Sequence, residues 1–189
     1  MESGDAETRA AARDPVGRGL ERAADGAAVF GGLVLSAMIV VTILSIAGRA
    51  LAGLGRHLPV FGAFGPVPGD FEILSMAGAV AVAAFMPLCQ MRAGHVVVDL
   101  LFRGAGPRWH ALFGVVANLL FVLVGALIVR SLVAGGLDKH AYRETTMLLR
   151  MPAWWGYAGM AAFFAQAVLC AAWLTLREAR DLFAPARSP

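Results

Sequence analysis

The segment that decides the arrangement of this chain is Met91–Arg103, MRAGHVVVDLLFR, which lies between two long apolar runs. When this segment is wound as a helix at about 100° per residue, its polar residues fall within one narrow stripe and its apolar residues cover the opposite face. The polar stripe consists of Arg92, His95, Asp99 and Arg103. A helix with this pattern lies in the plane of a membrane surface. The segment therefore predicts a short interfacial helix between two membrane spans.

The rest of the chain consists mainly of apolar blocks. Hydrophobic residues make up 59% of the 189 residues and the mean hydropathy is +0.70, whereas an average soluble domain is roughly 45–50% apolar. The blocks cover residues 27–48, 70–91, 110–134 and 153–176. Each is long enough to cross a hydrocarbon core of about 30 Å as a helix. Because the blocks are continuous and do not alternate, they predict an all-α membrane protein with four transmembrane helices instead of a β-barrel.

The sequence divides into three regions around these blocks. We expect a cytoplasmic N-terminal arm over residues 1–26, a membrane domain over 27–176 and a cytoplasmic tail over 177–189. Residues 1–13 are rich in Ala, Glu, Asp and Arg and predict disorder. Asp14 followed by Pro15 is a helix-start signal. The helix that begins there is expected to be either an interfacial arm leading into the first span or a solvated helical extension.

The distribution of basic residues predicts an orientation. The net charge is +3, but the arginines are spread among loops and tails, so no basic face for nucleic acid is predicted. If the N-terminus is cytoplasmic, ten of the 16 Lys and Arg residues lie on the cytoplasmic side and six on the other side. Because cytoplasmic segments carry the excess of positive charge, both termini and Met91–Arg103 are predicted to be cytoplasmic.

The spans lack the residues that catalysis or cofactor binding would need. All four histidines lie in loops or at helix ends, which excludes buried haem ligands: His57, His95, His110 and His140. No span has a central Asp, Glu or His for an intramembrane protease, and no P-loop, zinc or dinucleotide motif is present. Cys89 and Cys170 lie inside apolar blocks and predict no disulfide framework. We expect no enzyme, no cofactor and no metal site.

Five residues near the spans carry individual predictions. Pro87 predicts a kink near the end of the second span, and Gly94 predicts a break before the interfacial helix. Asn118 is expected to form a hydrogen bond with a neighbouring helix. Arg130 is expected either to reach the outer interface or to pair with Glu72, which lies at a similar depth.

Two motifs carry a family resemblance. Directly after the second span the sequence reads R-x-G-H-V-x-V-D-L-L, with Arg92, Gly94, His95, Val96, Val98, Asp99, Leu100 and Leu101. Before the fourth span it reads T…P-x-W-x-x-Y, with Thr145 or Thr146, Pro152, Trp154 and Tyr157. With four spans, cytoplasmic termini and Glu72 at the start of the second span, the chain resembles the small membrane subunit of tripartite ATP-independent periplasmic (TRAP) transporters, the DctQ-like family, over residues 20–178.

The resemblance implies a non-catalytic subunit of a bacterial inner-membrane transporter. In that family a periplasmic binding protein delivers a solute, commonly a carboxylate, and a sodium gradient drives uptake. The large, many-helix subunit moves the solute while the small subunit acts as a rigid scaffold. The remaining candidates are expected to have structural roles: Glu72, Pro87, Asn118, Arg130, Pro152, Trp154 and Tyr157.

The role of the polar stripe stays open between three interpretations. Arg92, Gly94, His95, Asp99 and Arg103 are expected to dock onto the large subunit or onto anionic lipid. Alternatively, the stripe is a solvated polar face, or the β-branched Val96–Val98 favours an extended segment. For the whole chain, the competing functions are a self-sufficient homodimeric transporter or exporter and a membrane assembly factor.

Overall fold

The computed structural model describes residues 15–54, 65, 67–92 and 107–183. These residues form four helices: α2 (Pro15–Leu54), α3 (Asp70–Met91), α5 (Pro107–Ala141) and α6 (Trp154–Phe183). Each helix contains a stretch long and apolar enough to cross a membrane. Within the described part of the chain the β-type pairing is limited to one isolated bridge in the loop before α6. The predicted all-α architecture with four transmembrane helices is confirmed.

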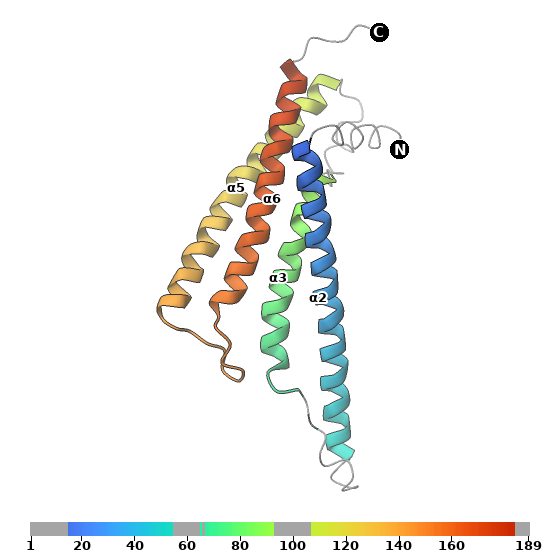
Figure 1. The fold of residues 1–189 in the computed structure, drawn as a ribbon, viewed down its shortest axis with the longest axis vertical. Helices are drawn as coiled ribbons and strands as arrows, with labels where there is room; N and C mark the ends of the chain where they lie inside the picture. Colours follow the sequence, from blue (N-terminus) through green and yellow to red (C-terminus); the bar gives the residue numbers. More distant parts are fainter. Residues whose placement is uncertain (1–14, 55–64, 66, 93–106, 184–189) are drawn as a thin grey trace.

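The helices are arranged in a row in the order α2, α3, α6 and α5 (Figure 1). The central helices α3 and α6 pack against each other, while α2 covers α3 and α5 covers α6. The beginning of α2 and the end of α6 lie at one end of the row, which we call the termini end (Figure 1). The opposite end, where α3 begins and α5 ends, is the loop end. This arrangement places α5 and α3 on different sides of α6.

Small side chains form the contacts between the helices. Besides Pro87, the buried apolar side chains of the described residues are eight alanines and one cysteine: Ala24, Ala27, Ala81, Ala83, Ala84, Ala161, Ala167, Ala171 and Cys170. Small residues let membrane helices approach closely, so that backbone and side-chain atoms pack without gaps. Some large apolar side chains pack between the helices against glycines, such as Val168 against Gly125, whereas most of the exposed ones lie on the two outer helices, such as Leu33 on α2 and Leu123 on α5. This exposed apolar surface is suited to lipid or to another membrane protein.

The first helix is described from Pro15, and it continues without a break through the first apolar block (Figure 1). A helix of 40 residues is about 60 Å long, roughly twice the thickness of the hydrocarbon core. The arm therefore continues the direction of the span, which favours the helical extension over an arm lying in the membrane plane. The predicted interfacial helix and its break at Gly94 fall outside the described residues.

Helix α3 coincides with the second apolar block and contains Pro87, whose side chain is fully buried. Pro lacks a backbone N–H, so one intrahelical hydrogen bond is missing at this point. The helix nevertheless continues for another turn, to Met91, and Arg92 caps it. The described chain therefore leaves α3 directly before the predicted interfacial segment.

Candidate functional site

Glu72, in the first turn of α3, holds the loop between α5 and α6. Its carboxylate oxygens accept hydrogen bonds from the backbone N–H groups of Leu148 (2.8 Å) and Leu149 (3.0 Å). The loop is also closed on itself, since Thr146 N–H donates to Met151 O (2.9 Å) and Met151 N–H donates to Thr146 Oγ1 (3.0 Å). A carboxylate that accepts two backbone N–H groups makes strong, charge-assisted bonds. Glu72 thus joins the loop between α5 and α6 to the start of α3.

Gly69 lets this loop approach α3. It has a φ of 75°, in the left-handed region that favours glycine, and it precedes the first residue of the helix. A Cβ atom on Gly69 would also lie 2.5 Å from Cγ of Leu149, which is closer than such atoms can approach. Two independent constraints, the backbone conformation and the Leu149 contact, therefore require glycine here.

The residues of the motif before α6 pack together at the loop end. Pro152 pairs with Thr145 in the isolated antiparallel bridge. The Trp154 ring meets the His140 ring edge-on, with 5.3 Å between the ring centroids. Tyr157 lies against two consecutive glycines near the end of α5, where a Cβ atom would come within 3.1 Å of its side chain. The motif therefore builds the junction between α5, the loop and α6.

Asp70 connects α3 to α2 at the same end. Its Oδ2 accepts hydrogen bonds from Ser45 Oγ and from Arg49 Nη2 (3.0 Å), and its Oδ1 accepts one from Phe71 N–H (2.9 Å). Ser45 is completely buried between the helices. The Arg49 guanidinium lies 5.9 Å from the centroid of the Phe71 ring, within the range of a cation–π contact. The loop end therefore carries two carboxylates, Asp70 and Glu72, that both bind other elements.

A chain of polar side chains joins three helices near the termini end. Gln90 Nε2 on α3 donates to Asn118 Oδ1 on α5 (2.6 Å), and Asn118 Nδ2 donates to Glu178 Oε2 on α6 (3.0 Å). Gln90 and Asn118 are buried. A Cβ atom at Gly114 would lie 2.9 Å from Glu178 Oε2, so the glycine makes room for the carboxylate. The predicted hydrogen bond from Asn118 to a neighbouring helix is confirmed.

Sequence reasoning missed Gln90 and Glu178 as the partners of Asn118. Both lie near the ends of apolar blocks, where polar residues are expected anyway. One signal was present, since Gly114 lies one helical turn before Asn118 and small residues mark close helix contacts.

Of the predicted polar stripe, the structure describes Arg92 alone. Arg92 Nη2 lies 3.5 Å from Asp25 Oδ1 on α2, and both side chains are at least half exposed. An exposed ion pair of this kind contributes little to stability. Gly94, His95, Asp99 and Arg103 lie outside the described residues, so the stripe stays a prediction.

Arg130 lies exposed on α5, and the predicted alternative that it pairs with Glu72 is wrong. Glu72 uses both carboxylate oxygens to bind the backbone of the loop. In addition, the row places α6 between α5, which carries Arg130, and α3, which carries Glu72 (Figure 1). Among the described residues, no hydrogen bond or ion pair is formed by Arg130.

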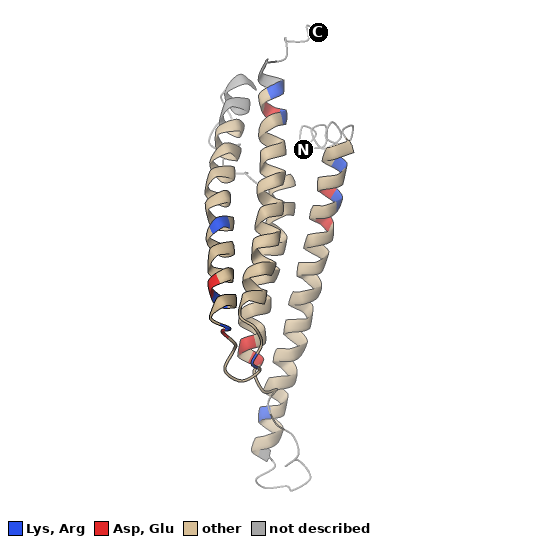
Figure 2. Ribbon diagram, turned by 60° about the vertical axis from the view of Figure 1, so that its left-hand side comes forward, with Lys and Arg blue, Asp and Glu red and all other residues tan. Residues whose placement is uncertain are grey.

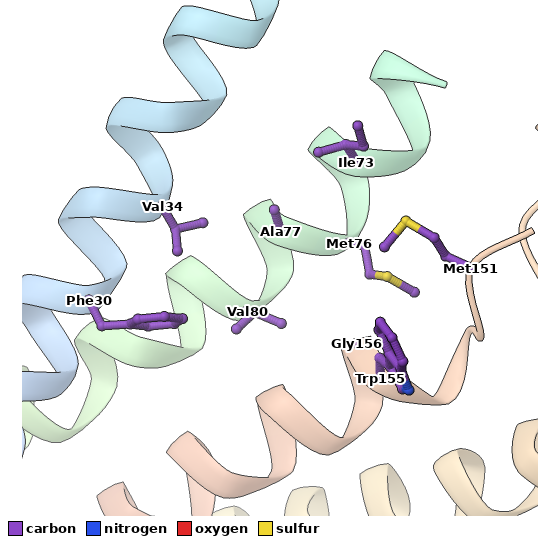
Figure 3. A pocket seen from close by; sticks show the side chains of 9 residues that line it. All are labelled: Phe30, Val34, Ile73, Met76, Ala77, Val80, Met151, Trp155 and Gly156. Atoms are coloured by element: carbon purple, nitrogen blue, oxygen red, sulfur yellow. The ribbon is translucent and has the colours of Figure 1, made fainter. Parts of the chain in front are cut away.

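A groove of 240 Å³ lies between α2, α3 and the beginning of α6. Its walls are apolar, with Phe30 and Val34 from α2, Met76 and Val80 from α3, and Trp155 from α6 (Figure 3). Such a lining suits an acyl chain or an apolar side chain and offers no group for acid–base chemistry. Among the described residues, no cluster of three or more His, Cys, Asp or Glu is placed to hold a metal ion.

The sequence of this chain matches a known protein family. The family model described as "Tripartite ATP-independent periplasmic transporters, DctQ component" matches residues 38–182, which is more than half of the chain. No curated protein and no solved structure matches the chain. The matched segment includes the contacts of Asp70 and Glu72 at the loop end and the polar chain around Asn118.

Proposed function

The chain belongs to the DctQ family of tripartite ATP-independent periplasmic transporters, and on this premise we propose that it is the rigid scaffold of such a transporter. It binds the large transport subunit stably in the bacterial inner membrane. A periplasmic binding protein docks transiently on the complex, and a sodium gradient drives uptake of a carboxylate-bearing solute. The family is a component of a transporter, and in this proposal the chain holds the large subunit in place and carries out no chemistry.

The observation that carries this proposal is how the polar groups of the bundle are used. At the loop end, Asp70 and Glu72 bind α2 and the loop before α6. Near the termini end, Asn118 connects α3 to α6. These carboxylates and amides are engaged in holding the helices together. A Na⁺ site needs free oxygen ligands near the middle of the membrane, and the described spans provide no free carboxylate there.

The arrangement of the helix ends supports the proposed orientation. The beginning of α2 and the end of α6 lie at the same end, as expected of a chain that crosses the membrane an even number of times (Figure 1). Figure 2 shows most of the charged residues toward the ends of the helices, with one basic residue further inside α5. With ten of the 16 Lys and Arg residues on the side of the termini, we assign the termini end to the cytoplasm.

Co-purification tests the scaffold function. The chain carrying an affinity tag is co-expressed with the large subunit, and the complex is reconstituted into proteoliposomes with the binding protein. We expect a stable complex of the two membrane subunits and solute uptake that requires both. A homodimer of this chain that transports solute alone would overturn the proposal in favour of a self-sufficient transporter.

The cytoplasmic segment after α3 is proposed to dock this scaffold onto the large subunit or onto anionic lipid headgroups. His95 and Asp99 are four residues apart, so they can pair on one face of a helix. Replacing both with Ala is expected to lower solute uptake or recovery of the large subunit. If both values stay at those of the unmodified chain, the docking role of this pair is excluded.

A further inference from the structure

Arg130 is an unusual residue in the described spans because of its depth. In the described helices the other charged residues lie at the ends of the apolar blocks or outside them. On α5 the next charged residue is Asp138, eight residues further on, which corresponds to about 12 Å along the helix axis. The His140–Trp154 aromatic contact, typical of the interface level, lies beyond Asp138. Arg130 is therefore attached to the backbone inside the apolar block 110–134, about one helical turn before its end.

The surface around Arg130 has the pattern of a helix-pairing seam. Exposed residues follow one another at alternating intervals of four and three residues, with Arg130 among them: Val116, Leu120, Leu123, Leu127, Ala134 and Leu137. This spacing keeps side chains on one stripe and is the pattern with which two helices interlock. The side of α5 that packs on α6 is opposite, since Gly125 lies against Val168 there. The stripe is therefore not used within this chain.

A charged side chain in a membrane helix normally faces a protein interior or a water-filled cavity, where it is paired. Arg130 faces neither in this chain, because it is exposed on an outer helix (Figure 1). A lipid phosphate is the other available counter-ion. However, the Cα–Cβ bond of a helical residue is tilted toward the helix N-terminus, and the nearer membrane surface lies toward the C-terminal end of α5. The Cα–Cβ bond of Arg130 therefore points away from the nearer phosphates.

The other outer helix provides a contrast. Helix α2 also exposes large apolar side chains, including Ile39 and Ile43, but its apolar block 27–48 contains no charged residue. Lipid alone can cover such a surface. On α5, by contrast, lipid could pair with Arg130 only through a phosphate reached against the direction of its Cα–Cβ bond. The need for a partner is thus specific to α5.

We propose that the stripe of α5 around Arg130 is the docking surface for a helix of the large transport subunit, and that a carboxylate of that helix pairs with Arg130 inside the membrane. This inference rests on the proposed function, which supplies the partner. It adds which side of the scaffold faces that partner and which charge the partner must present. The four-and-three spacing supplies the apolar contacts and Arg130 supplies the specificity, because a helix without an acidic residue would leave the guanidinium unpaired.

Photocrosslinking in the full complex tests the contact. A photoreactive amino acid at Leu127 is expected to crosslink to the large subunit, and the same residue at Ile43 serves as the control for a surface that lipid can cover. Because Leu127 lies on the stripe and is exposed, this variant leaves the packing on α6 unchanged. Crosslinks from Leu127 to lipid alone, in a complex that is intact by size-exclusion chromatography, would overturn the inference.

Charge variants test the pairing. Arg130→Glu and Arg130→Leu are expected to lower recovery of the large subunit at least about tenfold, because each leaves a membrane-embedded charge without its partner. Arg22→Leu, which removes an exposed arginine outside the apolar block, is the matched control. Restoration of the Arg130→Glu complex when the crosslinked carboxylate of the large subunit is changed to Arg would establish the pair. Recovery of both Arg130 variants at the level of the unmodified chain would exclude it.

The failure of this inference is distinguishable from failure of the proposed function. If the unmodified chain does not co-purify with the large subunit, the scaffold function itself is wrong. If it does co-purify, but Leu127 contacts lipid alone, the scaffold binds the large subunit through another face and Arg130 pairs with a lipid phosphate.

Discussion

The two ends of the helix row are held by different kinds of polar contact. At the loop end, Glu72 binds backbone N–H groups of the loop, so the contact does not depend on which side chains the loop carries. Near the termini end, the chain Gln90–Asn118–Glu178 joins side chain to side chain, so each member requires the others. A contact to backbone atoms tolerates substitution of the residue that supplies the backbone N–H. A side-chain network, by contrast, loses hydrogen bonds when any one of its members is replaced. The comparison predicts where single changes damage the scaffold most.

The largest effect is expected at the loop end, where a backbone conformation and a packing contact coincide. Gly69→Val places a β-branched residue at a φ of 75° and a Cβ atom against Leu149. We expect a loss of about 2–4 kcal/mol in the free energy of unfolding, from the left-handed backbone and the overpacked contact. Thermal unfolding of the purified protein in detergent measures this. Gly53→Val, at a helical glycine with open space around it, is the control.

The second effect concerns the side-chain network. Asn118→Leu removes the amide that serves both Gln90 and Glu178, and we expect a loss of about 1–2 kcal/mol, the upper range for hydrogen bonds between membrane helices. Ser36→Ala is the matched control, because Ser36 binds the carbonyl oxygen of Gly32 within its own helix. Equal midpoints of thermal unfolding for the two variants would show that the buried network contributes nothing.

The third prediction separates backbone contacts from side-chain contacts at the loop end. Glu72→Ala removes the acceptor for two N–H groups, so the loop before α6 should be cleaved faster by a protease. Leu148→Ala keeps the backbone N–H that binds Glu72 and leaves the cleavage rate nearly unchanged. Faster cleavage in both variants would mean that the loop is held by its side chains.

The smallest effect is expected for the exposed ion pair at the termini end. Arg92→Ala breaks the contact with Asp25, but both side chains are largely solvated. The thermal midpoint should therefore stay within experimental error of the unmodified protein. A clear decrease would indicate that Arg92 makes further contacts through the segment that follows it.

Much of the scaffold could be predicted from the sequence, because the formation of a membrane helix depends on residues that are neighbours in the chain. The apolar blocks predicted four helices, since only continuous runs of this length satisfy their backbone groups within a bilayer. Asn118 predicted a hydrogen bond because an amide in a span needs a partner. The order of residues after the second span and before the fourth carried the family resemblance. Each of these signals depends on neighbours in sequence or on the solvent alone.

The partners of the polar residues were decided by the tertiary structure. Glu72 binds a loop 76 residues away through backbone atoms, which leave no mark in the side-chain pattern. Gln90 and Glu178 meet at Asn118 because α3, α5 and α6 come together there. Glu72 binds the loop backbone with both carboxylate oxygens, and Arg130 is exposed on α5, so the two do not pair. Depth in the membrane follows from sequence position, but which helix faces which follows from packing among small side chains that the sequence spreads over every helix.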